Sequence, residues 1–333
     1  MDFFTKIDIP ATDWQIDYNS HVAFFGSCFA DNISAQFAAR KFKVLVNPFG
    51  TVYNPLSIAM QIKAIANKQV FGGPEVFQDM RPDRAGNNAP WHCWDAHGSL
   101  SAATREECVA KLNEASAHAL EFLQKTDVAF ITLGTSFVYF LKDIGAAVSN
   151  CHQQNPNLFI RKMISVDHVV AALKSIVQDL QKIKRDMRIV FTVSPLRHLS
   201  DGAHANTLSK ATLQLAINKI IEEQDFTTHT TEAAVQYFPS YEIVMDELRD
   251  YRFYDSDMIH LSKIAENYIF ERMTEAYCDS KTRDNIKQVE KFLKMANHRI
   301  QDAESSATAA FQQKLHAEAA KLESQIAGLE LNV

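Results

Sequence analysis

Short apolar runs alternate with segments of helical periodicity along most of the chain, and this alternation constrains the fold most strongly. HVAFF at 21–25 and VAFITL at 128–133 are continuously apolar, as in strands that are buried on both faces. Further strands are expected at 43–46, 188–193 and, with a weaker pattern, 235–238. Helices are expected at 29–41, 56–67, 103–125, 167–183 and 263–273. The order predicts an α/β fold with a parallel sheet covered by helices on both faces.

Small or polar residues follow each of the first four expected strands. GSC follows the first strand, NPFG the second, LGTS the third and SPLRH the fourth. Ligands of open parallel α/β sheets bind beyond the carboxyl ends of the strands. The pattern therefore predicts one site assembled from four loops.

Charge and cysteine content exclude several classes of protein. The net charge is −6 over 333 residues, so the chain lacks the overall positive charge that is typical of proteins that bind nucleic acid or acidic membranes. The start of the chain lacks a secretory signal, and no apolar run reaches the ~18 residues that span a bilayer. Five scattered cysteines without a CxxC pair suit a reduced protein better than a disulfide framework or a zinc site. We expect a cytoplasmic, soluble protein.

Two stretches offer residues for nucleophilic catalysis. Ser27 and Cys28 follow Gly26 where the first strand should end, and either side chain could be a nucleophile. A tight strand-to-helix turn favours small residues in any case. Asp257 and His260, three residues apart before the last helix, could act as an acid–base pair, although this spacing also fits a solvated loop.

The motif GSCFA at 26–30 resembles the signature of the GSCFA domain family. The resemblance extends over roughly residues 15–275, and the family is similar to SGNH (GDSL-type) hydrolases. The other stretches that carry it are NPFGTVYNP (47–55), TLGTSFVY (132–139), NCH (150–152), FTVSPLRHLSDGAHANTLSKATL (191–213) and YFPSYEIVMDELRDYRFYDSDMIH (237–260). It implies a flavodoxin-like three-layer sandwich, strand order 2-1-3-4-5, and ester or acyl chemistry.

Matched to the superfamily's blocks, Ser27 is the nucleophile, with Asp257 as the acid and His260 as the base. The backbone N–H groups of Ser27 and Gly50 would bind the oxyanion. Adjacent side chains on a strand-to-helix turn point in different directions, so Cys28 is interpreted as a packing residue.

The third block departs from the superfamily pattern. Relatives have G-x-N-D, in which the Asn side chain binds the oxyanion, whereas this chain has Gly134-Thr135-Ser136. The hydroxyl of Thr135 or Ser136 could replace that donor. Leu261 also stands where relatives usually have Pro.

Two further loops contain candidate substrate contacts. In PWHCWDAHGSLS (90–101), His92, Asp95 and His97 could contact substrate; a structural loop is the alternative, and the spacing fits no metal motif. In SPLRH, Arg197 and His198 are candidates, and Arg197 could bind a carboxylate or phosphate or instead pair with the acidic run 246–250. No metal or other cofactor is expected.

Residues 281–333 form a separate element behind a domain at 1–280. An apolar stripe with steps of three and four begins at Ile286 and predicts a helical tail, about 70 Å long if continuous. The stripe could dock on its own domain, turn back as a hairpin near Ser305-Ser306, or form a coiled coil with a second chain. Pairing of two chains in a homodimer is favoured.

The expected function is that of a serine hydrolase or acyltransferase acting on an ester or acyl group of a small or carbohydrate-linked substrate. No nucleic acid or membrane is expected as a partner. The alternative is a non-catalytic carbohydrate- or partner-binding module on the same fold.

Overall fold

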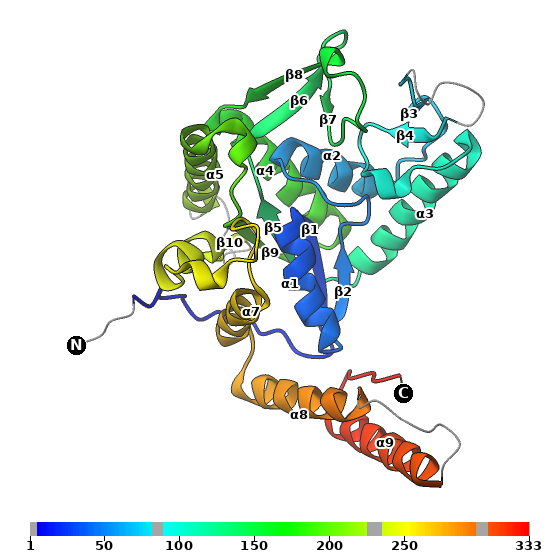
Figure 1. Ribbon diagram of the computed structural model, residues 1–333, viewed down its shortest axis with the longest axis vertical. Helices are drawn as coiled ribbons and strands as arrows, with labels where there is room; N and C mark the ends of the chain where they lie inside the picture. Colours follow the sequence, from blue (N-terminus) through cyan, green and yellow to red (C-terminus); the bar gives the residue numbers. More distant parts are fainter. Residues whose placement is uncertain (1–4, 82–88, 225–234, 298–305, 333) are drawn as a thin grey trace.

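Five parallel strands form the central sheet of the computed structural model, which describes residues 5–81, 89–224, 235–297 and 306–332. The strands are β1 (His21–Gly26), β2 (Lys43–Val46), β5 (Val128–Leu133), β9 (Arg188–Val193) and β10 (Val235–Tyr237). Their spatial order is β10-β9-β5-β1-β2 (Figure 1). Counted along the chain this is 2-1-3-4-5, so the expected flavodoxin-like, SGNH-type topology is confirmed.

The sheet is buried on both faces because its three central strands are apolar at most positions. In β1, Ala23 and Phe25 join the core on one face, while Val22 and Phe24 join the core on the other. The first face is covered by α2 (Pro55–Ala66), α3 (Arg105–Leu123), α4 (Val166–Ile183) and α5 (Ala203–Gln224). The second is covered by α1 (Cys28–Ala39) and α7 (Lys263–Tyr277). These are the three layers of the sandwich.

Side-chain caps fix where several helices begin. Asn54 accepts a hydrogen bond from the Ser57 N–H at the start of α2. Thr104, Ser165 and Ser262 cap α3, α4 and α7 in the same way. Such caps satisfy backbone N–H groups that have no partner within the helix.

Two small antiparallel sheets and a few short turns lie outside the central sheet. One pairs β3 (Val76–Gln78) with β4 (Trp91–Cys93), and the other has the order β7-β6-β8. The latter contains β6 (Phe137–Leu141), β7 (Ala147–Val148) and β8 (Phe159–Met163). The short helix α6 (Ser240–Glu242) continues into a π-helical turn over Ile243–Glu247.

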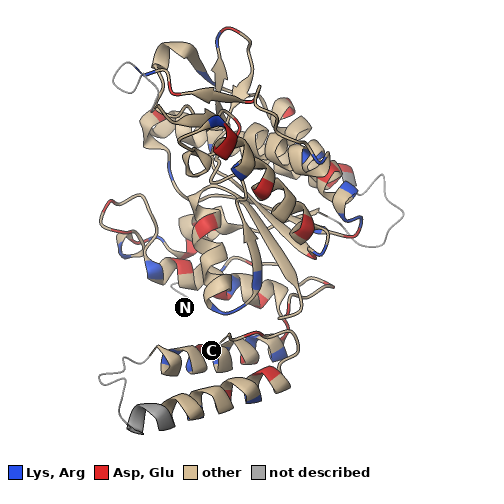
Figure 2. Ribbon diagram, turned by 90° about the vertical axis from the view of Figure 1, so that its right-hand side faces the viewer, with Lys and Arg blue, Asp and Glu red and all other residues tan. Residues whose placement is uncertain are grey.

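The expected helical C-terminal region is present, and it comprises two described helices. Helix α8 (Ser280–Ala296) and helix α9 (Ser306–Gln325) lie side by side (Figures 1 and 2). The hairpin expected near Ser305-Ser306 falls at the edge of residues 298–305, which lie outside the described residues.

The two helices dock on their own domain. Val289 of α8 and Leu322 of α9 are buried in the same core as Phe37 of α1. Arg40, which follows α1, pairs with Glu290 of α8 at 2.7 Å. The apolar stripe is thus covered within one chain, and a homodimer stays a prediction.

Three properties of the described residues bear on the expected class of protein. Lys and Arg are interspersed with Asp and Glu along the helices in the view of Figure 2. All five cysteines are unpaired. No helix in the described part of the chain has the length and apolar character that a membrane span requires.

Candidate active site

The turn between β1 and α1 places Ser27 at the carboxyl edge of the sheet, where the parallel strands end. Gly26 adopts φ +132°, and a Cβ at this position would lie 2.0 Å from the carbonyl oxygen of Thr132. Only glycine lets β1 and β5 approach this closely. Ser27 is 1% exposed, and its Oγ has no hydrogen-bond partner among the residues that the structure describes. It precedes α1 without capping it, so its hydroxyl is not used for structure.

A hydrogen-bonded chain from the loop after β2 holds this turn. Oδ1 of Asn47 accepts the Gly26 N–H at 2.8 Å, and its Nδ2 donates to Asp31 Oδ1 at 2.6 Å. Thr51 donates to the other oxygen of Asp31 at 2.7 Å. Sequence reasoning singled out the loop NPFG but none of these three residues. The network fixes the backbone on which Ser27 sits.

Cys28 is half-buried beside Ser27. Burial, and then the carboxylate of Asp31, raise the pKa of the Cys28 thiol. A raised pKa disfavours the thiolate, which is the nucleophilic form of cysteine. The chemistry of this turn therefore favours the hydroxyl over the thiol.

Asp257 and His260 form a hydrogen-bonded pair on the loop before α7. Asp257 Oδ2 lies 2.5 Å from His260 Nδ1, and Asp257 Oδ1 accepts the N–H groups of Ile259 and His260 at 2.9 Å. The hydrogen bond from His260, followed by those from the backbone, lowers the pKa of Asp257 to about 2. The side chains of His260 and Asp257 are 52% and 47% exposed. The loop thus presents an ionised carboxylate bound to an accessible imidazole.

Helices α1 and α7 run in the same direction. Helix α1 ends just before β2 begins. Tyr277, at the end of α7, accepts the N–H of Ile16, which precedes β1, at 2.6 Å. Both helices therefore end at the amino edge of the sheet and begin at its carboxyl edge. The rings of Phe37 and Phe270 are 5.0 Å apart and lie ten residues after Ser27 and His260, respectively.

The Asp257–His260 pair and Ser27 thus lie at the starts of two neighbouring helices. No hydrogen bond joins them, because Ser27 Oγ has no partner among the described residues. The structure brings Asp257 and His260 together and leaves the third member of the expected triad separate.

The two expected backbone donors already have acceptors. The N–H of Ser27 points to the Thr132 carbonyl at 3.4 Å, which is long for a hydrogen bond. The N–H of Gly50 donates to the Asn47 carbonyl at 2.7 Å in a tight turn. An oxyanion would have to displace these acceptors.

The expected third donor is engaged as well. The hydroxyls of Thr135 and Ser136 lie 3.0 and 3.1 Å from Ser209 Oγ of α5. Ser209 also accepts the Ser136 N–H at 2.7 Å. These contacts attach the loop after β5 to α5, and a role in oxyanion binding stays a prediction.

Lys210 lies at the same edge and was not anticipated from the sequence. Its Nζ donates to the carbonyls of Gly134 and Ser194 at 2.6 Å each, from a side chain that is 1% exposed. Burial, followed by the charge of Arg197, lowers the pKa of Lys210 to about 7. The amine ties the loop after β5 to the loop after β9.

The candidate residues of the SPLRH loop have different surroundings. The buried Nε2 of His198 has no hydrogen-bond partner in the described structure, and its ring meets Tyr53 edge-on at 5.5 Å. Burial, and then Lys210, lower the pKa of His198 to about 4, so the imidazole is neutral at pH 7. Arg197 lines a separate cavity.

The sequence pattern of the GSCFA family matches residues 21–273. The chain belongs to the GSCFA family. This match covers the turn at Ser27, the loops after the strands and the Asp257–His260 pair, and it excludes α8 and α9.

Solved structures resemble this GSCFA chain only distantly. A carbohydrate esterase family 3 protein from Talaromyces cellulolyticus has 9% identity and a TM-score of 0.33, with 80% of this chain and 98% of that one covered. An acetyl xylan esterase from Butyrivibrio proteoclasticus has 14% identity and a TM-score of 0.33, with 81% and 64% covered. A DUF4886 family protein from Bacteroides uniformis has 11% identity and a TM-score of 0.35, with 90% and 93% covered. No curated protein matches the sequence.

The candidate residues of the 90–101 loop of this GSCFA chain have separate partners. His92 Nδ1 lies 2.6 Å from Ser101 Oγ. The side chain of Asp95 is partly buried, and burial raises its pKa to about 6. His97 is exposed and accepts the Ser99 N–H at 3.2 Å. Contact with substrate stays a prediction for all three.

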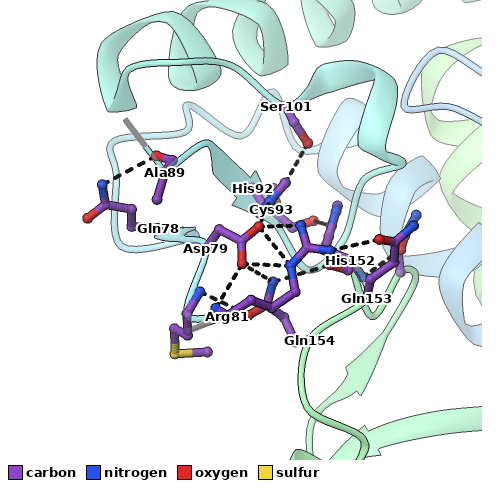
Figure 3. Close-up of polar contacts among 12 residues, drawn as sticks. Gln78, Asp79, Arg81, Ala89, His92, Cys93, Ser101, His152, Gln153 and Gln154 are labelled. Atoms are coloured by element: carbon purple, nitrogen blue, oxygen red, sulfur yellow. Dashed lines mark hydrogen bonds and ion pairs between the residues drawn. The ribbon is translucent and has the colours of Figure 1, made fainter. Parts of the chain in front are cut away.

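His92 belongs to a polar cluster that is centred on Asp79 (Figure 3). Asp79 binds Arg81 through both oxygens and accepts from Gln154 Nε2 at 2.9 Å. The ring of His92 stacks on that of His152 at 4.5 Å. The cluster attaches the β3–β4 ribbon to residues 150–154. No group of three or more His, Cys, Asp or Glu side chains in the described part of the chain is arranged to hold a metal ion.

Proposed function

We propose that this chain is a serine hydrolase or acyltransferase that acts on an ester or acyl group of a small or carbohydrate-linked substrate. The main support is the hydroxyl of Ser27, which is buried at the carboxyl edge of the sheet without a hydrogen-bond partner in the described part of the chain. Buried polar atoms without a partner are costly and therefore rare. The Asp257–His260 pair at the start of the neighbouring helix supplies the base that such a nucleophile needs.

In the proposed reaction, Ser27 Oγ attacks the carbonyl carbon while His260 Nε2 accepts the hydroxyl proton. Asp257 holds Nδ1 and stabilises the imidazolium that forms. Collapse of the tetrahedral intermediate expels the alcohol, which takes the proton from His260. Water or an acceptor hydroxyl then attacks the acylated Ser27 with the same proton transfers, and it releases an acid or a new ester.

The reaction requires the Asp257–His260 pair to reach Ser27. The pair lies on an exposed loop, and Met258 between the two residues has a left-handed backbone with φ +58°. Hydrogen bonds between catalytic groups often become short only in the complex with substrate. We therefore expect the loop to move toward Ser27 when substrate binds.

A non-catalytic carbohydrate- or partner-binding module is the second candidate. It is favoured by the missing hydrogen bond between Ser27 and His260 and by the acceptors that already occupy the backbone donors of Ser27 and Gly50. In such a module, the loops at the carboxyl edge would bind a ligand without an attack by Ser27.

Labelling with an uncharged fluorophosphonate separates the two candidates. An enzyme should be labelled on the peptide that contains Ser27, and Ser27→Ala should abolish the label. Cys28→Ala is the matched control, because it changes the adjacent nucleophile and should keep the label. A wild-type protein that stays unlabelled, or a Ser27→Ala protein that is still labelled, would exclude Ser27 as the nucleophile.

A further inference from the structure

A cavity of about 360 Å³ lies beside the Asp257–His260 pair. Met258 and Ile259, which directly precede His260, form part of its wall. Arg197 and Leu199, from the segment after β9, form another part. The volume is in the usual range of small-molecule sites, which is about 300–1,000 Å³. The cavity adjoins the proposed base without containing it.

The wall of this cavity is mainly apolar. Val244, Met245 and Leu248 contribute aliphatic surface. At its rim, Leu199, Tyr251 and Met258 are 48%, 76% and 54% exposed, which is high for large apolar side chains. Exposed apolar side chains that gather around one cavity are typical of a binding site. The lining suits an aliphatic chain or the face of a ring.

Three charged residues line this cavity: Arg197, Arg249 and Asp250. The sequence left open an ion pair between Arg197 and the acidic run 246–250. The acidic side chains of that run pair elsewhere: Asp246 with Arg249, Glu247 with Arg272, and Asp250 with Arg252. Within the described part of the chain, the Arg197 guanidinium has no carboxylate partner, and its side chain contacts the sulfur of Met245 at 3.8 Å.

Arg197 is half-buried in a mainly apolar wall, where a cation is less well hydrated than in open solvent and gains from an anionic partner. Its planar guanidinium can bind a carboxylate or phosphate through two parallel hydrogen bonds. Two other cationic side chains do not compete for this role. Arg249 at the rim already pairs with Asp246, and Lys210 donates to two carbonyls. Among the three charged lining residues, Arg197 is the one without an ion pair in the described part of the chain, so we expect an anion in the cavity to bind there.

We infer that the cavity binds the anionic end of the substrate, which is an ester with an apolar body and a terminal carboxylate or phosphate. Arg197 binds the anion, and the aliphatic wall binds the chain between the anion and the reacting carbonyl. This inference rests on the proposed function, because it places the ester next to His260. It makes Arg197 a specificity-determining residue.

A pair of esters of equal length tests the preference. We compare 4-nitrophenyl hexanoate with the mono-4-nitrophenyl ester of adipic acid, which adds a terminal carboxylate. The wild type should prefer the adipate in kcat/KM by roughly 10- to 100-fold, as expected for hydrogen bonds between charged groups. Arg197→Met should bring the ratio close to one, and Arg197→Lys should retain part of the preference. Arg252→Met, an exposed arginine outside the cavity, is the matched control and should keep the wild-type ratio.

Calorimetry on the Ser27→Ala protein tests binding without turnover. Hexyl phosphate and hexanoate should bind, and adding Arg197→Met should weaken both by roughly 10- to 100-fold. Hexanol, which has no charge, should be unaffected by that change. Comparison of the two anions shows whether phosphate or carboxylate is preferred.

The outcomes separate the inference from the proposed function. Anion binding that depends on Arg197, in a protein that fluorophosphonate does not label, would support the anion site and overturn the proposed function. Labelling of Ser27 with equal use of both esters, or with a ratio unchanged in Arg197→Met and Arg197→Lys, would overturn the anion site alone. Thermal unfolding of each variant checks that it is folded.

Discussion

Nδ1 of His260 lies 2.5 Å from Oδ2 of Asp257, and the same carboxylate accepts the backbone N–H of His260. Asp257 therefore fixes both the tautomer and the orientation of the ring, and Nε2 is left as the proton acceptor. This pair is assembled before any contact with Ser27.

Asp257→Asn should reduce the rate of Ser27 labelling and of ester turnover by about 10²–10⁴-fold, because the amide no longer stabilises the imidazolium. The free energy of unfolding should change little, since both side chains are half exposed. Asp255→Asn, an exposed change in the same loop, should leave the rate as it is. If Asp257→Asn and Asp255→Asn are labelled and turn over ester at equal rates, Asp257 has no role in the mechanism.

Gly26→Ala should destabilise the protein by about 2 kcal/mol or more, because alanine is strained at φ +132° and its Cβ would meet the Thr132 carbonyl. Denaturant unfolding measures the loss. Gly98→Ala is the control, since a Cβ there meets nothing within 4 Å, and it should be nearly neutral. A Gly26→Ala protein as stable as wild type would show that the turn can open.

Lys210→Met should cost about 2 kcal/mol, since it leaves the buried carbonyls of Gly134 and Ser194 without their donor. Lys219→Met removes an exposed ion pair with Asp167 from the same helix and should change the stability by less than about 0.5 kcal/mol. If the two variants are equally stable, the hydrogen bonds from Lys210 to the two carbonyls do not contribute to stability.

Asp95→Asn should stabilise the protein at pH 8 and not at pH 3.5. Burial raises the pKa of Asp95 to about 6, above its usual 3.8, so the folded state binds more protons than the unfolded state between these values. Stability contributed by this group is therefore lost as pH rises from about 3.8 to 6. The gain at pH 8 should be at most about 3 kcal/mol, the free energy that corresponds to a pKa change from 3.8 to about 6. Thermal unfolding of the wild type and Asp95→Asn at both pH values measures this gain. An equal change in Tm at pH 3.5 and pH 8 would contradict the burial of the carboxylate.

Val289→Ala in α8 should cost about 2 kcal/mol, because Val289 is fully buried in the core shared with Phe37. Lys291→Ala, exposed on the same helix, should be neutral. Light scattering on the wild type tests the predicted homodimer independently. A neutral Val289→Ala together with a dimeric wild type would indicate that α8 binds a second chain instead of its own domain.

The sheet could be predicted because its strands are continuously apolar over five or six residues, as at 21–26 and 128–133. The strand order came from the family resemblance. Strands β6 to β8 were missed because they are short and partly exposed, so apolar and polar residues do not alternate clearly along their sequences. Whether the C-terminal region forms one helix or two could not be decided from the sequence, because neither glycine nor proline marks a turn between α8 and α9.

The candidate site was predictable only where a motif identified it. Ser27, Asp257 and His260 lie in motifs, whereas Lys210 lies in a polar helical segment and resembles a surface lysine. Its burial depends on Gly134, 76 residues away in sequence, and no local pattern indicates that contact. Asn47 and Asp31 were missed for the same reason, since their partners lie on different elements.

Leu331, which follows α9, is fully buried in the core that also contains Val22 and Phe24. The core on that side of the sheet is thus completed by residues about 300 positions apart, whereas the opposite core contains no described residue after Tyr241. During synthesis, the opposite core can form once Tyr241 has emerged, whereas the core around Phe24 is completed only when Leu331 has been made. Until then, the apolar surface that α8, α9 and Leu331 cover in the folded protein is open to water, and such transiently exposed surface is prone to aggregation.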